Sequence, residues 1–457
     1  MVTSTTWQKY WDEERETRDP NERDRLILDQ LQKQLHYVYN RIPFYQRLYD
    51  AHAVKPQDIQ SLEDFSTKIP VVTKKMLIAD QAEYPPFGSY VGDVEDVDVA
   101  RIHGSTGTSG TPTLYRVSKK DWERAAVVHA MAQWAAGIRP DDIFQISFPF
   151  TLFFGGWGIL QGAERLGATC FPIGTLDSER QIELIQRLGS TVFTATPSYG
   201  MHLLSVAEKM GVDLRESSIK RLMIGGEPGG CIPGTRDALR EGWGAMTHDA
   251  GTTSEMYPFQ TNVETEAGEG VICITDEVYT EVLERDDANA PVPYGTRGAV
   301  VYTHLWRESQ PMIRFWPGDE TVMEPGPSSC GRTYPRLPGG VLGRIDDMLV
   351  VRGANVYPST IETGLRAVPE LGAEFLITLE RKGAMDEIRV EVEAGPSLGA
   401  ELTRLSSTAR EEREREFAGE AERQLKKITG LRIPVKILDA GALPATVFKA
   451  SRVKDLR

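Results

Sequence analysis

The sequence predicts an α/β protein of mixed α+β composition, divided into two domains. The chain has 457 residues, more than the roughly 250 to 300 at which a single hydrophobic core stops growing. Hydrophobic residues make up 40% and charged residues 26% of it, a composition typical of a soluble globular protein. Strand-like apolar runs alternate with helical segments, as at 191–196 before Pro197, and this alternation favours a domain rich in βα units.

The first long helix is predicted over Asp24 to Tyr39, where apolar residues recur at spacings of two to four before Pro43. The N-terminus before it lacks the basic and apolar segments of a signal peptide. No apolar run approaches the roughly 20 residues that cross a bilayer. We therefore expect a cytoplasmic protein without a membrane partner.

The charge balance and the cysteines argue against several classes of protein. The formal net charge is −14, which disfavours nucleic acid or an anionic membrane as the main partner. The four cysteines are far apart and form no CxxC pair, so their spacing predicts neither a disulfide framework nor a zinc site. They are Cys170, Cys231, Cys273 and Cys330.

Residues 342–362, LGRIDDMLVVRGANVYPSTIE, predict a charged turn, a short strand over Met348 to Val351, a second turn and a helix that opens at Pro358. Spacing alone is equally typical of an ordinary loop, strand, loop and helix unit. The stretch places a boundary near residue 342, with domains at 1–342 and 343–457.

The same stretch resembles the hinge of adenylate-forming enzymes, in the form of the phenylacetate-CoA ligase branch, and motifs in matching order cover nearly the whole chain. The resemblance implies a large N-terminal domain with parallel-rich sheets that binds ATP and an acid. A small C-terminal α+β domain then swings between an acid-adenylating and a thioester-forming pose. By resemblance Arg344 binds the ribose hydroxyls, Asp346 is the pivot, and Arg352 and Gly353 face the active site in the second pose.

Residues 104–112, GSTGTSGTP, contain three glycines and five hydroxyl residues in nine positions. Such a loop is dense in N–H and O–H donors and suits a triphosphate, although it lacks the Walker A pattern and is also typical of a flexible linker. By resemblance it is the phosphate-binding loop. Thr111 stands where the family usually has lysine, so part of the positive charge is missing. The contact residues would be Ser105, Thr106, Thr108 and Ser109.

Residues 148–167 combine aromatic side chains with glycines. Such a segment can wall a flat apolar pocket, and core packing explains the pattern equally well. The resemblance assigns this segment to the aryl-substrate region, where Phe150, Phe153 and Trp157 fall on or beside pocket positions.

Residues 224–228, IGGEP, follow an apolar strand. A turn of this kind can expose backbone to a flat base, and a routine strand end is the alternative. The resemblance makes it a candidate adenine site formed by Gly226, Glu227 and Pro228.

Residues 248–255, HDAGTTSE, offer oxygen ligands for Mg²⁺ and hydroxyls for a phosphate. By resemblance Asp249 binds the adenine amine, Ser254 the α-phosphate and Glu255 the Mg²⁺, so Glu255 is also a catalytic candidate. The family commonly has an aromatic residue near Gly251 to pack on the adenine, and its absence here would weaken or reshape nucleotide binding.

Asp319 ends the segment PMIRFWPGD, residues 311–319. The segment resembles the family's strand and Gly-Asp turn, with Pro317 in place of Thr, and the resemblance gives Asp319 both ribose hydroxyls. Some relatives carry a zinc site near here. This chain has 328–330, SSC, where a Cys pair would fall and Ile272 near the expected His, so we expect no zinc.

The C-terminus, GALPATVFKASRVKDLR, holds the strongest catalytic candidate, Lys449. A tail lysine without context is normally just solvated. The pattern resembles the family's catalytic tail, in which such an ammonium stabilises the charge that develops as the acyl-adenylate forms. Phe448 replaces the usual glycine before it.

The resemblance implies an AMP-forming acid–thiol ligase that adenylates an aromatic acid, of the phenylacetate or substituted benzoate type, and transfers it to coenzyme A. ATP, Mg²⁺ and coenzyme A are its expected cofactors and co-substrates. A carrier-protein thiol as acceptor, activation of a non-carboxylate group, and nucleotide binding without catalysis remain the alternatives. A homodimer is one possible assembly, and the sequence does not determine the oligomeric state.

Overall fold

The computed structural model describes residues 7–105, 113–345, 349–351, 354–382, 385–444 and 452–456. The chain folds into two compact units. The first contains Met1–Leu176, Ser190–Thr194 and His248–Val341, and the second contains Asp177–Gly189, Ala195–Thr247 and Leu342–Arg457. A junction between units lies at residue 342, but the second unit also takes 195–247, so the functional division into 1–342 and 343–457 stays a prediction.

The first unit opens with helices, and the long helix starts earlier than expected because Asp19 caps it. The Asp19 carboxylate accepts the N–H groups of Asn21 and Glu22, and Pro20 occupies the first turn. The helices of this unit are α1 (Glu13–Glu16), α2 (Pro20–Arg41), α3 (Pro43–Ala51), η1 (Pro56–Asp58), α4 (Leu62–Lys68), α5 (Lys74–Glu83), η2 (Asp96–Asp98), α6 (Lys119–Ala135), α7 (Phe154–Leu166) and η4 (Ser254–Met256).

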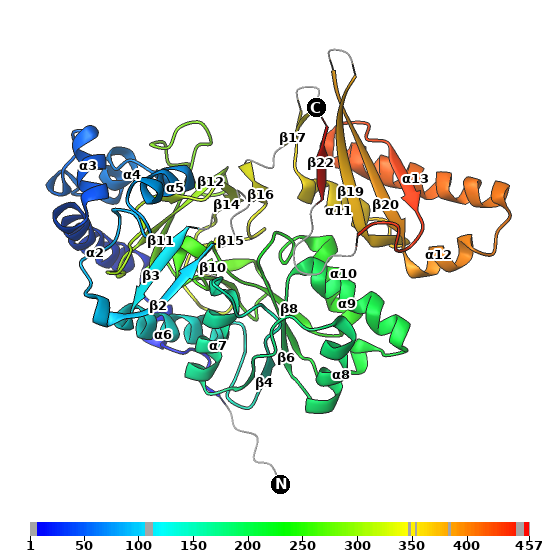
Figure 1. Cartoon of the computed structure of the whole chain (residues 1–457), viewed down its shortest axis with the longest axis horizontal. Helices are drawn as coiled ribbons and strands as arrows, with labels where there is room; N and C mark the ends of the chain where they lie inside the picture. Colours follow the sequence, from blue (N-terminus) through cyan, green and yellow to red (C-terminus); the bar gives the residue numbers. More distant parts are fainter. Residues whose placement is uncertain are drawn as a thin grey trace, which may run out of the picture. The chain divides into compact units, whose positions relative to one another are not determined.

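The six-stranded sheet is built around the long strand β12. This strand pairs antiparallel with β11, β13 and β14, and β13 in turn pairs parallel with β1 (Figure 1). The strands of the first unit are β1 (Val72–Thr73), β2 (Val99–Gly104), β3 (Leu114–Ser118), β4 (Ile143–Gln145), β5 (Thr169–Phe171), β9 (Asn262–Glu264), β10 (Val271–Cys273), β11 (Val278–Leu283), β12 (Arg297–His304), β13 (Phe315–Trp316), β14 (Asp319–Val322) and β15 (Arg336–Leu337).

A five-stranded sheet in the order β5-β4-β6-β7-β8 contains the predicted βα alternation. Strand β6 (Val192–Ala195) is buried throughout and pairs parallel with β4, and helix α9 begins at Pro197 directly after it. The predicted α/β fold with mixed α+β composition is thus confirmed. Further elements here are α8 (Ser178–Leu188), α9 (Pro197–Met210), η3 (Leu214–Glu216), β7 (Arg221–Ile224), α10 (Pro233–Trp243) and β8 (Met246–Asp249).

The C-terminal part of the second unit packs helices on a four-stranded sheet in the order β21-β20-β19-β22 (Figure 1). A Cβ on Gly364 would lie 2.6 Å from Leu425, so α11 and α13 pack closely there. The elements are β16 (Gly343–Arg344), β17 (Leu349–Val351), β18 (Ala354–Val356), α11 (Pro358–Arg366), β19 (Leu371–Lys382), β20 (Met385–Ala394), α12 (Pro396–Leu402), α13 (Ser407–Thr429), β21 (Val435–Leu438) and β22 (Val453–Asp455).

Helix α10 joins the two parts of the second unit. Thr235 donates a hydrogen bond of 3.3 Å to Glu362 on α11, and a Cβ on Gly234 would lie 2.7 Å from Arg366. This close approach explains why 195–247 groups with the C-terminal segment.

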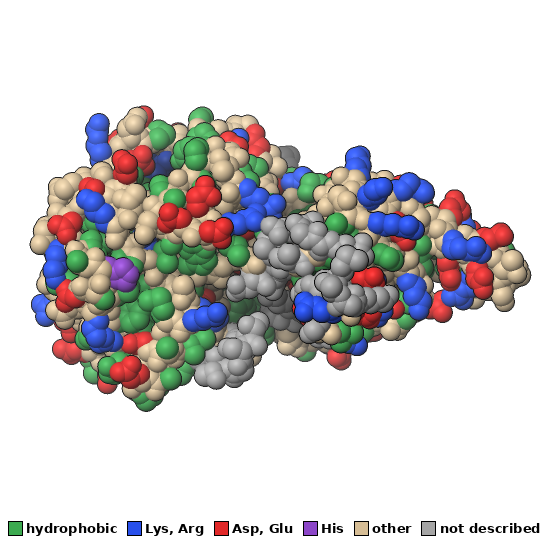
Figure 2. Space-filling view, turned by 90° about the horizontal axis from the view of Figure 1, so that it is seen from above, with side chains coloured by type: hydrophobic (Ala, Val, Ile, Leu, Met, Phe, Trp, Pro, Cys, Tyr) green, Lys and Arg blue, Asp and Glu red, His purple; other side chains and the backbone are tan. Residues whose placement is uncertain are grey.

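Charged side chains of both signs lie among each other on the face shown in Figure 2. No helix in the described part of the chain is long and apolar enough to cross a membrane.

A buried ion pair ties the N-terminus to the loop before β15. Arg332 Nε lies 2.5 Å from Glu16 Oε2, and the two side chains are 4% and 1% exposed. Removing one partner of a buried pair leaves an uncompensated charge, which costs about 3 to 5 kcal/mol.

We therefore expect Arg332→Ala to lower the free energy of unfolding by about 3 kcal/mol, measured by urea denaturation. Arg413→Ala is the matched control, because the Arg413–Glu401 pair is partly exposed to solvent and exposed ion pairs contribute much less to stability than buried ones. Equal effects of the two substitutions would contradict this account.

Candidate active site

The hairpin β2–β3 brackets the predicted phosphate-binding loop. Gly104 pairs with Leu114, and the Ser105 N–H donates to the Thr113 carbonyl at 3.0 Å. Ser105 is buried, so a structural hydrogen bond already uses this predicted phosphate contact. Within the loop, the predicted contacts Thr106, Thr108 and Ser109 lie outside the described residues, as does Thr111.

A chain of buried hydroxyls leads inward from this hairpin. Ser105 Oγ lies 2.9 Å from Thr113 Oγ1, which is hydrogen-bonded to Tyr115 Oη. Burial first, and then the negative charge of Glu255, raises the pKa of Tyr115 well above its ordinary value. Tyr115 therefore stays protonated and connects the base of the loop to the Glu255 carboxylate.

Glu255 lies in the single turn η4, which follows β8 and Thr253. Its side chain is almost fully buried, and the Lys74 ammonium lies 3.1 Å from Glu255 Oε1. Neither Glu255 Oε1 nor Thr253 Oγ1 has a hydrogen-bond partner among the residues that the structure describes, although both atoms are buried. Two buried oxygens in one turn fit a hard divalent cation, which takes oxygen ligands.

Arg307 fixes the backbone of this turn from below. It is fully buried, and its Nη1 donates to the carbonyls of Glu255 and Tyr257 at 3.3 Å, while Nη2 donates to the carbonyl of Arg116. Burial lowers the pKa of Arg307, and the charge of Asp121 opposes that shift. The turn that presents Glu255 is thus held by a charged donor.

The predicted adenine and ribose contacts of the first unit lie at strand ends. Asp249 closes β8, and its N–H donates to Glu264 Oε2 at 3.2 Å. Asp319 opens β14. Gly251 adopts a φ of +124°, a conformation that L side chains rarely adopt. This backbone conformation explains why glycine occupies position 251. The family commonly has an aromatic residue near this position. The roles of Asp249, Ser254 and Asp319 stay predictions.

In the second unit, Glu227 faces the start of α9. Its carboxylate accepts the N–H and the hydroxyl of Ser198, and burial raises its pKa. This contact caps the positive end of a helix. Gly226 has a φ of +87°, as a turn after β7 requires. Pro228 follows in the same turn, and Arg344 lies in β16. Their nucleotide contacts stay predictions.

The predicted aromatic pocket residues gather at the start of α7. Phe150 and Trp157 meet edge to face with ring centroids 5.2 Å apart, and the Trp157 indole donates to the Thr151 carbonyl at 2.9 Å. Phe153 packs over Gly155, where a Cβ would lie 2.1 Å from its ring. The Arg101 guanidinium stacks on Trp157, 4.6 Å from the ring centroid. Phe150 and Trp157 thus come together, whereas Phe153 covers its own helix.

Other predicted residues lie outside the described part of the chain: Asp346, Arg352, Gly353, Phe448 and Lys449. Where zinc was not expected, Cys330 Sγ lies 2.9 Å from Ser328 Oγ. Among the described residues, no group of three or more His, Cys, Asp or Glu side chains could hold a metal ion.

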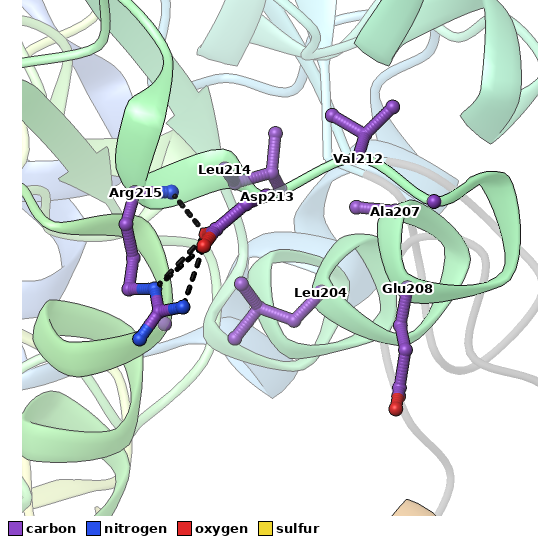
Figure 3. A pocket seen from close by; sticks show the side chains of 9 residues that line it. Leu204, Ala207, Glu208, Val212, Asp213, Leu214 and Arg215 are labelled. Atoms are coloured by element: carbon purple, nitrogen blue, oxygen red, sulfur yellow. Dashed lines mark hydrogen bonds and ion pairs between the residues drawn. The ribbon is translucent and has the colours of Figure 1, made fainter.

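A separate cavity of about 370 Å³ opens in the second unit between α9, η3 and α10. Figure 3 shows Leu204, Val212 and Leu214 around it, with Arg215 turned to Asp213, 2.5 Å between Nη2 and Oδ2. Arg215 and Asp213 form an ion pair with each other, and no predicted site residue lines the cavity. We therefore assign no chemical role to this cavity.

Sequence reasoning missed Lys74, Thr113 and Tyr115. Lys74 is the first residue of helix α5, directly after the two-residue strand β1. An isolated lysine, threonine or tyrosine carries no local signal, since only the fold brings these side chains to Glu255.

Buried histidines beside the site make its stability depend on pH. His103 lies on β2, stacked on Phe154 with centroids 4.1 Å apart, and burial lowers its pKa to about 4. Burial also lowers the pKa of His129 to about 3. In the unfolded chain both titrate near 6.5, so between these values the unfolded state binds more protons.

The unfolding free energy should therefore fall as the pH drops from about 6.5 to 4, by up to about 3 kcal/mol for His103. Urea denaturation across this range tests the slope. His103→Gln should reduce the slope, leaving the part that the other buried histidines, His129 and His304, contribute. An unchanged slope in that variant would rule out His103 as a source.

Comparison of the chain with known proteins identifies several similar proteins. A family model described as the AMP-binding enzyme C-terminal domain matches residues 353–457. The phenylacetate-coenzyme A ligase of Thermus thermophilus is 35% identical, over 96% of this chain and 98% of the relative. That of Escherichia coli K12 is 31% identical, over 97% of each chain.

Solved structures of 2-hydroxyisobutyryl-CoA ligase are also similar. In its postadenylation state with 2-HIB-AMP, that enzyme is 40% identical with a TM-score of 0.93, covering 99% of this chain and 94% of its own. In its thioesterification state with 2-HIB-AMP and CoA, the TM-score is 0.73 at 40% identity, over 98% and 92% of the two chains. The chain therefore belongs to the phenylacetate-CoA ligase branch of the adenylate-forming enzymes, and it is an AMP-forming acid–CoA ligase.

Proposed function

We propose that the enzyme activates an aromatic carboxylic acid with ATP in the turn around Glu255 and passes the acyl group to coenzyme A. The observation that carries the proposal is the buried Glu255 carboxylate, which has one oxygen without a hydrogen bond among the described residues. It interacts with Tyr115, the inner end of the hydroxyl chain from Ser105. This hydroxyl chain joins a cation-binding oxygen to the base of the glycine-rich loop.

The reaction divides into two displacements. A carboxylate oxygen of the acid attacks the α-phosphorus of ATP and pyrophosphate leaves. The thiol of coenzyme A then attacks the acyl carbon, loses its proton, and AMP leaves. Bound at Glu255, Mg²⁺ would supply positive charge to the phosphates. Residues of the first unit orient the nucleotide: Asp319 at the ribose, Asp249 at the adenine, and Ser254 at the α-phosphate.

The pair Phe150 and Trp157 supports an aromatic acid, because aromatic walls bury flat apolar ligands well. A second candidate is a small branched hydroxy acid. The similar solved structures are of a ligase named for 2-hydroxyisobutyryl-CoA. We place the enzyme in the cytoplasm, as the sequence predicts. Light scattering would test whether it forms a homodimer.

The acid should be identified by pyrophosphate release with ATP and Mg²⁺ against phenylacetates, benzoates and 2-hydroxyisobutyrate, each with and without coenzyme A. We expect an aromatic acid to give AMP and an aryl-CoA by mass spectrometry. Turnover of 2-hydroxyisobutyrate alone would favour the second candidate. Adenylate without thioester would indicate another acceptor, and no activity with any acid would contradict the proposal.

Lys449→Ala should slow adenylation by roughly 100- to 1,000-fold, the loss seen when one charge-stabilising donor is removed. Thioester formation from supplied acyl-adenylate should change far less, because the second step does not expel pyrophosphate. Single-turnover assays of each half-reaction measure the two rates. Equal losses in both would refute a role confined to adenylation.

A further inference from the structure

The Lys74 ammonium pairs with the carboxylate of Glu255, the residue proposed to hold the metal ion. Its Nζ lies 3.1 Å from Glu255 Oε1, the same buried oxygen that has no hydrogen-bond partner among the described residues. The contact is therefore an ion pair without hydrogen-bond geometry. Lys74 is 35% exposed and Glu255 is 4% exposed, so the lysine reaches inward from the surface to a buried carboxylate.

Strand pairing holds Lys74 in place. Thr73 pairs with Trp316 in the β1–β13 ladder, and its hydroxyl accepts the Met76 N–H at 3.4 Å as the cap of α5. Lys74 is the first residue of that helix. Lys75 follows it on the exposed side. The backbone that carries Lys74 is thus fixed by strand pairing and by the helix cap. Lys75 provides a matched control position, because it does not contact Glu255.

The start of a helix is an unfavourable place for a lysine. The helix dipole puts partial positive charge there, and α5 has no acidic residue in its first turn. Glu255 is the carboxylate that offsets this repulsion. A phosphate that enters beside Lys74 would meet both the ammonium and the positive end of this helix, and both favour an anion.

Resting on the metal role proposed for Glu255, we propose that Lys74 is an internal competitor for the divalent cation. In the nucleotide-free enzyme its ammonium neutralises Glu255 and repels a metal ion, so the metal binds weakly. ATP brings several negative charges, which accommodate the metal and the ammonium together. Metal binding and nucleotide binding are thereby coupled through one lysine.

The test is a titration of the full-length enzyme with Mn²⁺, followed by electron paramagnetic resonance of the free ion, without nucleotide. We expect Lys74→Ala to bind Mn²⁺ about fivefold or more tightly than the wild type, in the range that removal of a competing ion pair allows. The Mn²⁺ affinity of Lys75→Ala should stay within about twofold of that of the wild type. The affinity of Lys74→Arg should resemble that of the wild type, because arginine keeps the positive charge. With a non-hydrolysable ATP analogue, the wild type should gain Mn²⁺ affinity more than Lys74→Ala does.

Equal Mn²⁺ affinities of the nucleotide-free wild type and Lys74→Ala would overturn the inference, as would equal tightening by Lys75→Ala. If Lys74→Ala does not fold, as judged by circular dichroism, Lys74→Gln gives the same comparison with a side chain that keeps polarity without charge. Glu255→Gln separates the two proposals. If it binds Mn²⁺ with the ATP analogue as the wild type does, the metal role of Glu255 fails and this inference with it, whereas failure of the lysine comparison alone leaves that role intact.

Discussion

The buried carboxylate of Glu255 sets the main constraint on the first unit. A charge removed from water needs a cation or donors around it, since otherwise its desolvation costs several kcal/mol. Lys74 supplies the cation, Tyr115 the hydroxyl, and Arg307 holds the carbonyl of the same residue. Each of these groups comes from a different segment, so the position of Glu255 depends on helix α5, hairpin β2–β3 and the loop after β12.

A buried charge with its own partners also fixes the sheet that precedes Lys74. Arg314 is wholly buried, lies 3.4 Å from Glu281 Oε2, and donates to the carbonyls of Ile69 and Ala288. Its own carbonyl accepts the Val72 N–H at 2.9 Å, which begins the β1–β13 pairing. Arg314 has a φ of +47°, a conformation that a non-glycine residue keeps only where its surroundings fix it. The buried Arg314–Glu281 ion pair therefore helps to fix the strand that places Lys74 beside Glu255.

Local chemistry made several elements predictable. The strand predicted at 191–196 and the helix predicted from Pro358 both form, because apolar runs and N1 prolines act over a few residues. The helix predicted over 24–39 was too short at both ends, since its cap at Asp19 precedes the apolar pattern. Among the site residues, Phe150 and Trp157 lie together, but Phe153 covers its own helix, which spacing alone does not distinguish.

The sequence by itself determined the α/β class, the residue types of a nucleotide site and the family resemblance. Each of these depends on composition, on periodicity or on motifs of adjacent residues. Only the tertiary structure decided that Lys74 meets Glu255 and that Tyr115 joins Glu255 to Ser105. The physical reason is that burial and charge pairing arise between segments far apart in the chain. Their energies depend on which groups share a water-excluded space, and no local pattern encodes that neighbourhood.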